Sequence, residues 1–511
     1  MSVADEPVHK LPTGIRGLDP LLLGGLPAGR PTLVAGTTGS GKTVMAAEFL
    51  ARGILTFGAA GVFVTFEESP ADLRANIASL GFDVAAFEAD GRWAFVDASA
   101  QPGGEEVVGD YDLAALVARV AHAVASVGAT RVVLDSIGAV FSRYSGAGVV
   151  RRELVRVIAG LRELGVTALI TAERTHDYDS IARFGVEEFV ADNVVLLRNV
   201  VENEKRRRTI EILKLRGAPH RSGEFSFTIV PREGISVMPL ALISLREQAS
   251  TERVALGPAG LDAMLGGGVF RDSVSLGSGP TGIGKTLVAT SFAAASAAAG
   301  ERCLLVSFEE STDQLHRNAA SWGLDLAALE AAGLLRVVSE YPEVASLEDH
   351  FVALRQHVDT FGPRRVAIDN LSALERISTT RGMRDFVIGF GSYVRSADIT
   401  TLLTSSSSTL VGTESVTEVH ASTLTDAIVL LRYVELASEV RRAVCVLKVR
   451  GAVHDTRIHE FRIDDHGMQV GEPFTGVSGI LAGSVVPSLG PAAPSALPPL
   501  ARPQGDRDEA G

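Results

Sequence analysis

Short apolar runs alternate along the chain with longer stretches rich in alanine and leucine. In the first half these runs cover residues 31–35, 61–66, 131–135, 167–171 and 193–198. They are β-branched or apolar throughout, as buried strands are, and the stretches between them have helical character. This alternation predicts a mostly parallel sheet with helices on both faces, so the expected fold class is α/β.

Chain length and composition favour two such domains. The chain has 511 residues, which exceeds what one hydrophobic core normally supports. Residues 237–253 join the two halves, and we expect domains at 1–247 and 248–471. From residue 472 the chain becomes rich in proline and alanine, which predicts a flexible, disordered tail over 472–511.

Charge and cysteine content exclude several classes of protein. The formal net charge of −13 argues against a general electrostatic grip on nucleic acid, so DNA binding is not expected. Cys303 and Cys445 lie in apolar runs and support neither a disulfide framework nor a cysteine-rich metal site. The N-terminus has no apolar signal core, and no apolar stretch approaches bilayer length. We therefore expect a soluble, cytoplasmic protein without a membrane partner.

One glycine-rich motif occurs twice, each time between an apolar strand and an apolar helix. The copies are Gly36-Thr37-Thr38-Gly39-Ser40-Gly41-Lys42-Thr43 and Gly279-Pro280-Thr281-Gly282-Ile283-Gly284-Lys285-Thr286. In such a loop, backbone N–H groups and a helix N-terminus hold phosphates, the lysine meets their charge and the threonine meets Mg²⁺. The pair predicts a nucleotide triphosphatase with duplicated domains, each binding ATP and Mg²⁺.

The duplication extends beyond the loops. Lys42 and Lys285 lie 243 positions apart, whereas Asp135 and Asp369 lie 234 apart. The first half thus carries about eight extra residues before its acidic strand, and from that strand onward we expect the halves to align without a gap.

Repeated carboxylates follow two of the predicted strands in each half. Asp135 and Asp369 end apolar runs, where a triphosphatase carboxylate polarises the water shell of Mg²⁺; a simple helix cap is the alternative. Phe66-Glu67-Glu68 and Phe308-Glu309-Glu310 should reach the γ-phosphate at the carboxyl edge of the sheet. Adjacent carboxylates raise each other's pKa, which suits a general base, although a solvated acidic turn would also fit. Glu67 and Glu309 are the preferred bases, with Glu68 and Glu310 beside them.

Repeated cations lie far along the sequence from the phosphate loops. They are Lys214 and Arg216 in the first half and Lys448 and Arg450 in the second. In a ring of subunits they could reach a neighbour's γ-phosphate as arginine fingers do, which would require oligomerisation. The alternative is that they are ordinary strand-end charges.

The halves differ at one pair of hydroxyl residues. At an offset of 234, Ser422 and Thr423 stand opposite Glu188 and Phe189. Serine and threonine are common in turns, so a capping pair is one interpretation. The other is a pair of phosphoacceptors, with one half hydrolysing ATP and the other transferring phosphoryl groups to protein.

With these residues in place, the chain resembles the KaiC family, the tandem RecA-type ATPases and autokinases of the bacterial circadian clock. The resemblance runs from about Thr13 to Gly471. Beyond the loops and carboxylates it rests on Gly24-Gly25-Leu26-Pro27, Val149-Val150-Arg151-Arg152-Glu153-Leu154, Leu347-Glu348-Asp349-His350 and Ala421-Ser422-Thr423-Leu424-Thr425-Asp426.

The resemblance implies two tandem RecA-like P-loop domains in a double-ringed homohexamer with ATP between subunits. The first ring would be a slow ATPase. The second would phosphorylate Ser422 and Thr423 across the subunit interface, with Glu309 activating the acceptor and Thr43, Thr286 and Glu309 as Mg²⁺ contacts. Thr417 matches a threonine that influences the family's phosphate cycle. Residues 106–112 match the region associated with KaiB, which favours a KaiB-like partner. The tail keeps only Ser478-Gly479-Ile480 of the family pattern, which argues against a KaiA-like activator.

Two other functions fit the same loops. A RecA-like, ATP-dependent DNA-handling protein would need a basic pore, against the net charge of −13. A nucleotide-gated signalling scaffold without timing would hydrolyse ATP but form no phosphoprotein.

Overall fold

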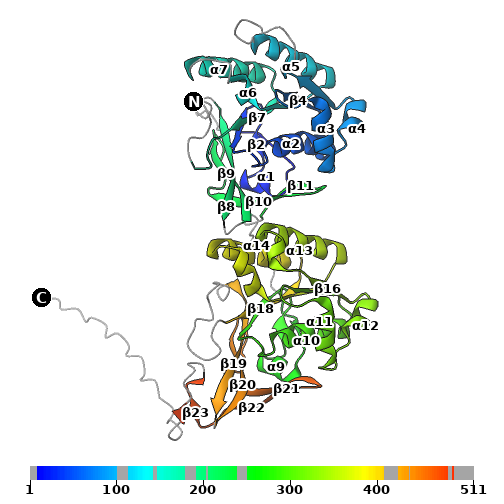
Figure 1. Cartoon of the computed structure of the whole chain (residues 1–511), viewed down its shortest axis with the longest axis vertical. Helices are drawn as coiled ribbons and strands as arrows, with labels where there is room; N and C mark the ends of the chain where they lie inside the picture. The colour runs from blue at the N-terminus through cyan, green and yellow to red at the C-terminus, as the bar shows by residue number, and fades with distance from the viewer. Residues whose placement is uncertain are drawn as a thin grey trace, which may run out of the picture.

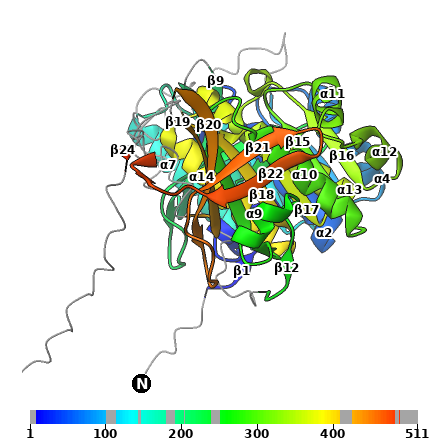
Figure 2. The same ribbon diagram turned by 90° about the horizontal axis from the view of Figure 1, so that it is seen from below.

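The computed structural model consists of two similar halves stacked along the long axis of the molecule (Figure 1). It describes residues 8–99, 113–141, 147–178, 191–202, 205–238, 250–407, 424–436, 438–480 and 486–487. Seen along that axis, one half lies behind the other (Figure 2). Each half contains a nine-stranded sheet, so the predicted α/β fold with tandem sheets is confirmed.

The first sheet combines a parallel part with an antiparallel extension. Its strand order is β11-β10-β9-β8-β3-β7-β6-β4-β5. The strands from β5 to β8 in this order are parallel, and β9, β10 and β11 continue the sheet antiparallel. The strands are β3 (Thr32–Gly36), β4 (Gly61–Thr65), β5 (Trp93–Asp97), β6 (Arg131–Asp135), β7 (Thr167–Glu173), β8 (Asn193–Glu202), β9 (Lys205–Leu215), β10 (Glu224–Val230) and β11 (Gly234–Val237), and β1 (Lys10–Leu11) pairs separately with β2 (Leu26–Pro27).

The second sheet repeats this arrangement in the order β16-β15-β17-β18-β14-β19-β20-β21-β22. Its strands are β14 (Val274–Gly279), β15 (Cys303–Ser307), β16 (Leu335–Ser339), β17 (Arg365–Asp369), β18 (Thr400–Ser406), β19 (Ala427–Leu436), β20 (Glu439–Val449), β21 (His459–Asp464) and β22 (Gly467–Pro473). Two short strand pairs complete the described part of this half: β12 (Arg253–Val254) with β13 (Val269–Phe270), and β23 (Val477–Ser478) with β24 (Val486–Pro487).

The expectation of a gapless alignment after the acidic strand is wrong at one strand. Arg131 pairs with Thr167, but its counterpart Arg365 pairs with Thr400, so β18 begins one residue earlier than the offset of 234 requires. The offset returns at β19, where Ala427 stands in the place of Asn193. The connections before and after β18 absorb this difference.

Both faces of each sheet are buried, which explains the uninterrupted apolar runs. Val62 and Val64 belong to the core on one face of the first sheet, and Phe63 between them belongs to the core on the other. Successive side chains of a strand point to opposite faces, so a strand covered on both sides is apolar at every position.

Helices form the outer layers. In the first half they are α1 (Leu18–Leu21), α2 (Lys42–Phe57), α3 (Pro70–Ser79), α4 (Val84–Ala89), α5 (Leu113–Val127), α6 (Ile137–Phe141) and α7 (Ala147–Glu163). In the second half they are α9 (Ala259–Met264), α10 (Lys285–Ala298), α11 (Thr312–Ala320), α12 (Leu326–Ala331), α13 (Leu347–Phe361) and α14 (Thr380–Ser396), with 3₁₀ turns η2 (Pro342–Val344) and η3 (Leu371–Ile377). Among the described residues, none of the helices combines the length and apolar character needed to cross a bilayer.

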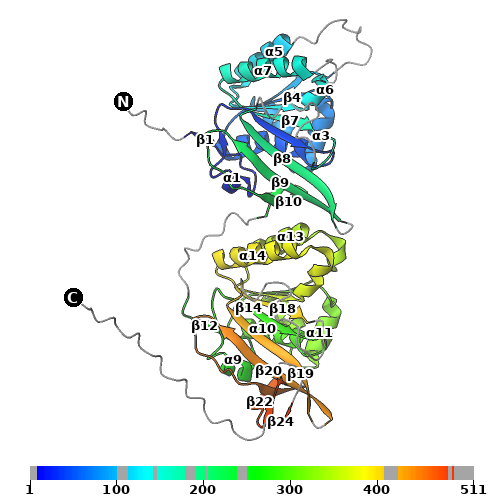
Figure 3. The same cartoon turned by 90° about the vertical axis from the view of Figure 1, so that its left-hand side faces the viewer.

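The halves meet where the antiparallel strands of the first approach α13 and α14 of the second (Figure 3). Arg207 on β9 forms an ion pair with Glu348 on α13 at 3.3 Å, and Thr228 on β10 donates to Asp349. At the other end of the second half, β22 continues to Pro473, and Ile480 is buried beside Val434 and Ala443. The start of the segment expected to be a tail is therefore packed on the second sheet.

Candidate functional site

The first phosphate loop connects the end of β3 to the start of α2. Gly41 caps α2 with φ 95°, a left-handed conformation that favours glycine. A Cβ on Gly36 would lie 2.4 Å from Ser40 Oγ and 2.7 Å from the Leu197 carbonyl oxygen, so the strand must end in glycine. Lys42 Nζ donates to the carbonyl oxygens of Gly36 and Thr37 at 2.9 and 3.0 Å, which folds it over the loop.

Three carboxylates surround Lys42 at the carboxyl edge of the sheet. Burial lowers the pKa of Lys42, and the negative charges of Glu173, Asp135 and Glu67 act in the opposite direction. Burial raises the pKa of Glu67, and the neighbouring Asp135 and Glu173 raise it further. The structure thus brings Lys42, Glu67 and Asp135 together as predicted, in an arrangement that can hold a proton near a phosphate.

The second phosphate loop has the same geometry between β14 and α10. Gly284 caps α10 with φ 117°, and Lys285 Nζ donates to the carbonyl oxygens of Gly279 and Pro280, each at 3.0 Å. Ile283 is fully buried in the apolar core, and its backbone N–H donates to the Pro280 carbonyl oxygen at 3.4 Å, as the Ser40 N–H donates to Thr37 at 3.2 Å in the first loop. The unusual Pro280 and Ile283 therefore leave the backbone cradle intact.

Asp369 is tied directly to the second loop. It accepts hydrogen bonds from Thr286 Oγ1 at 2.7 Å and from Thr404 Oγ1 at 2.5 Å, and burial raises its pKa. In the first half Asp135 accepts from Thr171, the counterpart of Thr404. Hydroxyl and carboxylate oxygens are the hard ligands that Mg²⁺ prefers, so these donor atoms fit the predicted ion.

The two glutamates of each pair have different surroundings. Glu68 and Glu310 accept hydrogen bonds from Asn76 on α3 and Asn318 on α11, at 3.0 and 2.9 Å. Glu67 and Glu309 are the members of each pair whose charge acts on the loop lysine. Glu67 and Glu309, the bases preferred from the sequence, thus differ from Glu68 and Glu310 in acting on the lysine.

The repeated cations lie at the opposite edge of each sheet from their own phosphate loop. Leu215, beside Lys214, pairs with Asn193, which pairs with Thr32 at the start of β3. The loop follows the other end of β3, about 13 Å away at roughly 3.3 Å per residue. In the second half Lys448 pairs with Ile428, near the start of β14. One chain therefore does not bring these cations to its own phosphates.

Each pair of cations contacts the residues just before the neighbouring strand, which is β8 in the first half and β19 in the second. Lys214 Nζ donates to the Ala191 carbonyl oxygen at 2.8 Å, and Arg216 lies 3.4 Å from Asp192. Lys448 Nζ donates to the Thr425 carbonyl oxygen at 2.6 Å, and Arg450 lies 3.6 Å from Asp426. Ser422, Thr423 and Thr417, and the predicted KaiB-associated residues 106–112, lie outside the described residues.

Sequence reasoning missed several polar groups around the first loop. Glu173 accepts from Thr38 Oγ1 at 2.9 Å, and Asp177 accepts from Thr37 Oγ1 at 2.8 Å. Arg208 on β9 donates to the Gly39 carbonyl oxygen at 3.1 Å. Glu173 could have been found, because it ends the strand next to β3, and polar residues at the carboxyl ends of parallel strands meet at one edge.

Two phosphate loops, each beside carboxylates at the carboxyl edge of a largely parallel sheet, define a tandem P-loop nucleoside triphosphatase. A sequence profile described as "ATPase: KaiC" matches residues 11–241 and 254–474. The chain belongs to the KaiC ATPase family, which confirms the predicted resemblance and implies that it binds ATP.

Similar proteins cover nearly the whole chain. Circadian clock protein KaiC3 of Synechocystis sp. is 53% identical over 478 residues, which are 93% of this chain and 94% of that protein. Circadian clock oscillator protein KaiC of Thermostichus vulcanus is 48% identical over 477 residues, covering 93% and 92%. The protein of that name from Synechococcus elongatus is 47% identical over 479 residues, covering 94% and 92%.

Proposed function

We propose that this chain is an autophosphorylating, clock-type ATPase that works as a homohexamer in the cytoplasm. The first unit, residues 1–247, hydrolyses ATP. The second, residues 248–471, transfers the γ-phosphoryl group of ATP to Ser422 and Thr423 of a neighbouring subunit. The circadian assignment rests on the relatives named circadian clock proteins.

The observation that carries this proposal is the position of Thr425. Its carbonyl oxygen accepts from Lys448, and Asp426 pairs with Arg450, at the edge of the sheet opposite the second phosphate loop. Thr423 is only two residues before Thr425. The cations and Thr425 thus lie at one edge of the sheet and the phosphate loop at the other, which supports transfer between chains rather than within one.

The transfer uses residues in defined roles. An acceptor oxygen attacks the γ-phosphorus, the bond from that phosphorus to the β–γ bridging oxygen breaks, ADP leaves, and the acceptor proton passes to Glu309. Lys285 and the loop backbone hold the phosphates, while the neighbour's Lys448 and Arg450 meet the developing charge. Thr286, Asp369 and Glu309 would hold Mg²⁺, which neutralises phosphate charge when bound. In the first unit, Glu67 would play the part of Glu309 toward water, with Thr43 at the ion.

A KaiB-like protein is the proposed partner of the first unit, at residues 106–112. We propose no KaiA-like activator, since the sequence after Gly471 departs from the family pattern.

Incubation with Mg²⁺ and γ-labelled ATP tests the autokinase. We expect label on wild-type chains and none on a Ser422→Ala/Thr423→Ala variant. Glu67→Gln should retain the label and lose first-unit hydrolysis, whereas Glu309→Gln should lose the label. If wild type labels no better than the double alanine variant, the autokinase is rejected and the nucleotide-gated scaffold takes its place.

A further inference from the structure

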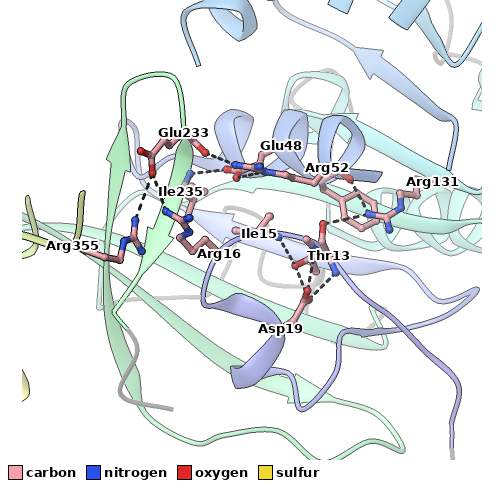
Figure 4. Close-up of polar contacts among 12 residues, drawn as sticks. Thr13, Ile15, Arg16, Asp19, Glu48, Arg52, Arg131, Glu233, Ile235 and Arg355 are labelled. Carbon is pink, nitrogen blue, oxygen red and sulfur yellow. Dashed lines mark hydrogen bonds and ion pairs between the residues drawn. The ribbon is translucent and has the colours of Figure 1, made fainter. Parts of the chain in front are cut away.

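A buried carboxyl group links the helix of the first phosphate loop to the second half of the chain. Glu48 lies on α2, one turn and a half after Lys42, and its side chain is completely buried. Its oxygens accept hydrogen bonds from the Ile235 backbone N–H at 2.6 Å and from Arg52 Nε at 3.2 Å. Figure 4 shows these contacts between α2 and the start of β11.

The chain passes very close to Glu48 at this point. A Cβ on Gly234, which has φ 85°, would lie 2.4 Å from Glu48 Oε2. Arg52 continues the contact, because its Nη2 donates to the Glu233 carbonyl oxygen at 2.6 Å. Glu48 and Arg52 therefore hold residues 233–235, the turn from β10 into β11, against the phosphate-loop helix.

The side chain of Glu233 points the other way, toward the second half. Its carboxylate accepts from Gln356 Nε2 at 2.7 Å and pairs with Arg355 at 3.5 Å, both on α13. Arg16, from the segment before α1, pairs with the same carboxylate at 3.0 Å (Figure 4). Residues 233–235 are thus held by α2 through Glu48 and Arg52, and by α13 through the side chain of Glu233.

Helix α13 also contacts Phe308, the residue before the second carboxylate pair. The ring of His350 packs edge-on against Phe308, with ring centroids 5.2 Å apart. Phe308 directly precedes Glu309, and its N–H donates to the Asp369 carbonyl oxygen at 2.8 Å. A continuous series of packed groups therefore runs from α2 through residues 233–235 and α13 to the second nucleotide site.

Glu48 can change state within this series. Burial raises its pKa to about 7, although the Ile235 N–H and the charges of Arg52 and Arg16 favour the ionised form. The charged groups that act on it are Arg52 on its own helix and Arg16 before α1, whereas the carboxylate of Glu233 in the turn points away from it toward α13. A negative charge formed at this buried site is most simply stabilised by entering water. Water can enter only if residues 233–235 move away from α2.

We propose that Glu48 is a proton-controlled latch between the halves: loss of its proton loosens residues 233–237, and Arg355 passes this change to α13 and the second carboxylate pair. The second half has no such group, because Ser291 stands at the position equivalent to Glu48. The inference concerns the two nucleotide sites and goes beyond the proposed function, since it does not depend on phosphorylation of Ser422 or Thr423. By linkage, a nucleotide that changes α13 would also change proton binding at Glu48.

Hydrogen exchange of the full-length chain between pH 6 and pH 8, corrected for intrinsic exchange rates, tests the latch. In wild type we expect exchange in residues 233–237, in α13 and around Phe308 to rise several-fold through neutral pH. Glu48→Gln keeps an acceptor for the Ile235 N–H but cannot titrate, so these segments should lose their pH response. Arg355→Met should retain the response in residues 233–237 and lose it in α13.

Asp262→Asn is the matched control. Asp262 in the second half also accepts two backbone N–H bonds, from Leu256 and Gly257 at 2.6 and 3.2 Å. Its substitution should leave the response of residues 233–237 unchanged. The latch is refuted if α13 follows pH equally in wild type and Glu48→Gln, or if its response persists in Arg355→Met. Neither result depends on detecting a phosphoprotein.

Discussion

At the scale of single residues, Glu48 also makes a prediction about stability. Its pKa is about 7 in the folded chain, whereas an unfolded glutamate titrates near 4.3. The folded state therefore holds this proton more tightly, so the contribution of Glu48 to stability is fully present below about pH 4 and is lost as pH rises toward 7. A difference of roughly 2.5 pKa units corresponds to at most about 3 kcal/mol in the free energy of unfolding.

Glu48→Gln should remove this fall, so the variant gains stability over wild type as pH rises from 5 to 8. The chain has two tryptophans, Trp93 in the first half and Trp322 in the second. With Trp322 replaced by Phe in every variant, the fluorescence of Trp93 reports urea unfolding of the first half alone. Glu88→Gln, which removes the half-buried partner of Arg74, should keep the wild-type pH dependence. Parallel curves for wild type and Glu48→Gln would show that Glu48 is already ionised at pH 5.

At the scale of elements, strand β14 contains two glycines that differ in how much space a side chain would have. A Cβ on Gly279 would lie 2.7 Å from the Leu431 carbonyl oxygen and 3.0 Å from Ile283 Cγ2, at the entrance to the second phosphate loop. A Cβ on Gly277, two residues earlier, would meet nothing closer than 4.0 Å. Gly279→Ala should therefore displace the loop and weaken nucleotide binding at the second site at least tenfold.

Nucleotide bound per chain, measured by equilibrium dialysis at a concentration that saturates both wild-type sites, checks this prediction. We expect about two nucleotides for wild type and for Gly277→Ala, and about one for Gly279→Ala. Two nucleotides bound to Gly279→Ala with unchanged affinity would mean that the loop adapts to the added methyl group.

Elements also show what could be predicted from sequence. The parallel strands were found because both of their faces are buried, so that Val62, Phe63 and Val64 are apolar in succession. The start of strand β9 could not be predicted in this way, because it consists of Lys205-Arg206-Arg207-Arg208. Arg208 faces the phosphate loop and Arg207 faces Glu348 of the second half, and these are tertiary contacts without a local signal.

The same limit applies to the site. Lys42, Glu67 and Asp135 could be assembled from motif spacing, because the carboxyl ends of parallel strands share one edge. The link from Glu48 to Arg355 could not, since it depends on how the two halves stack. Glu48 itself reads as one of a few polar residues on a largely apolar helix, and only the approach of Gly234 reveals that it is enclosed.

At the scale of the whole molecule, each phosphate loop and its cations lie at opposite edges of one sheet, so the proposed action of the cations on phosphate requires two chains. Glu67→Gln damages the loop side of an interface, and Arg216→Met damages the cation side. Each variant alone should hydrolyse little ATP at the first site, in a Lys285→Ala background that silences the second. In rings mixed at equal amounts, about one interface in four combines an intact Glu67 with a neighbour's Arg216. Hydrolysis should then recover to about a quarter of the parent rate.

Rings mixed from Glu67→Gln and Lys42→Ala chains provide the control, since both defects lie on the loop side and no interface can be restored. Their hydrolysis should stay at the level of the separate variants. Exchange of subunits can be verified by energy transfer between differently labelled chains. If exchange is complete and the Glu67→Gln and Arg216→Met mixture still recovers no hydrolysis, Arg216 does not act across the interface. Its contact with Asp192 would then be the whole of its role, as a strand-end charge that holds the start of β8.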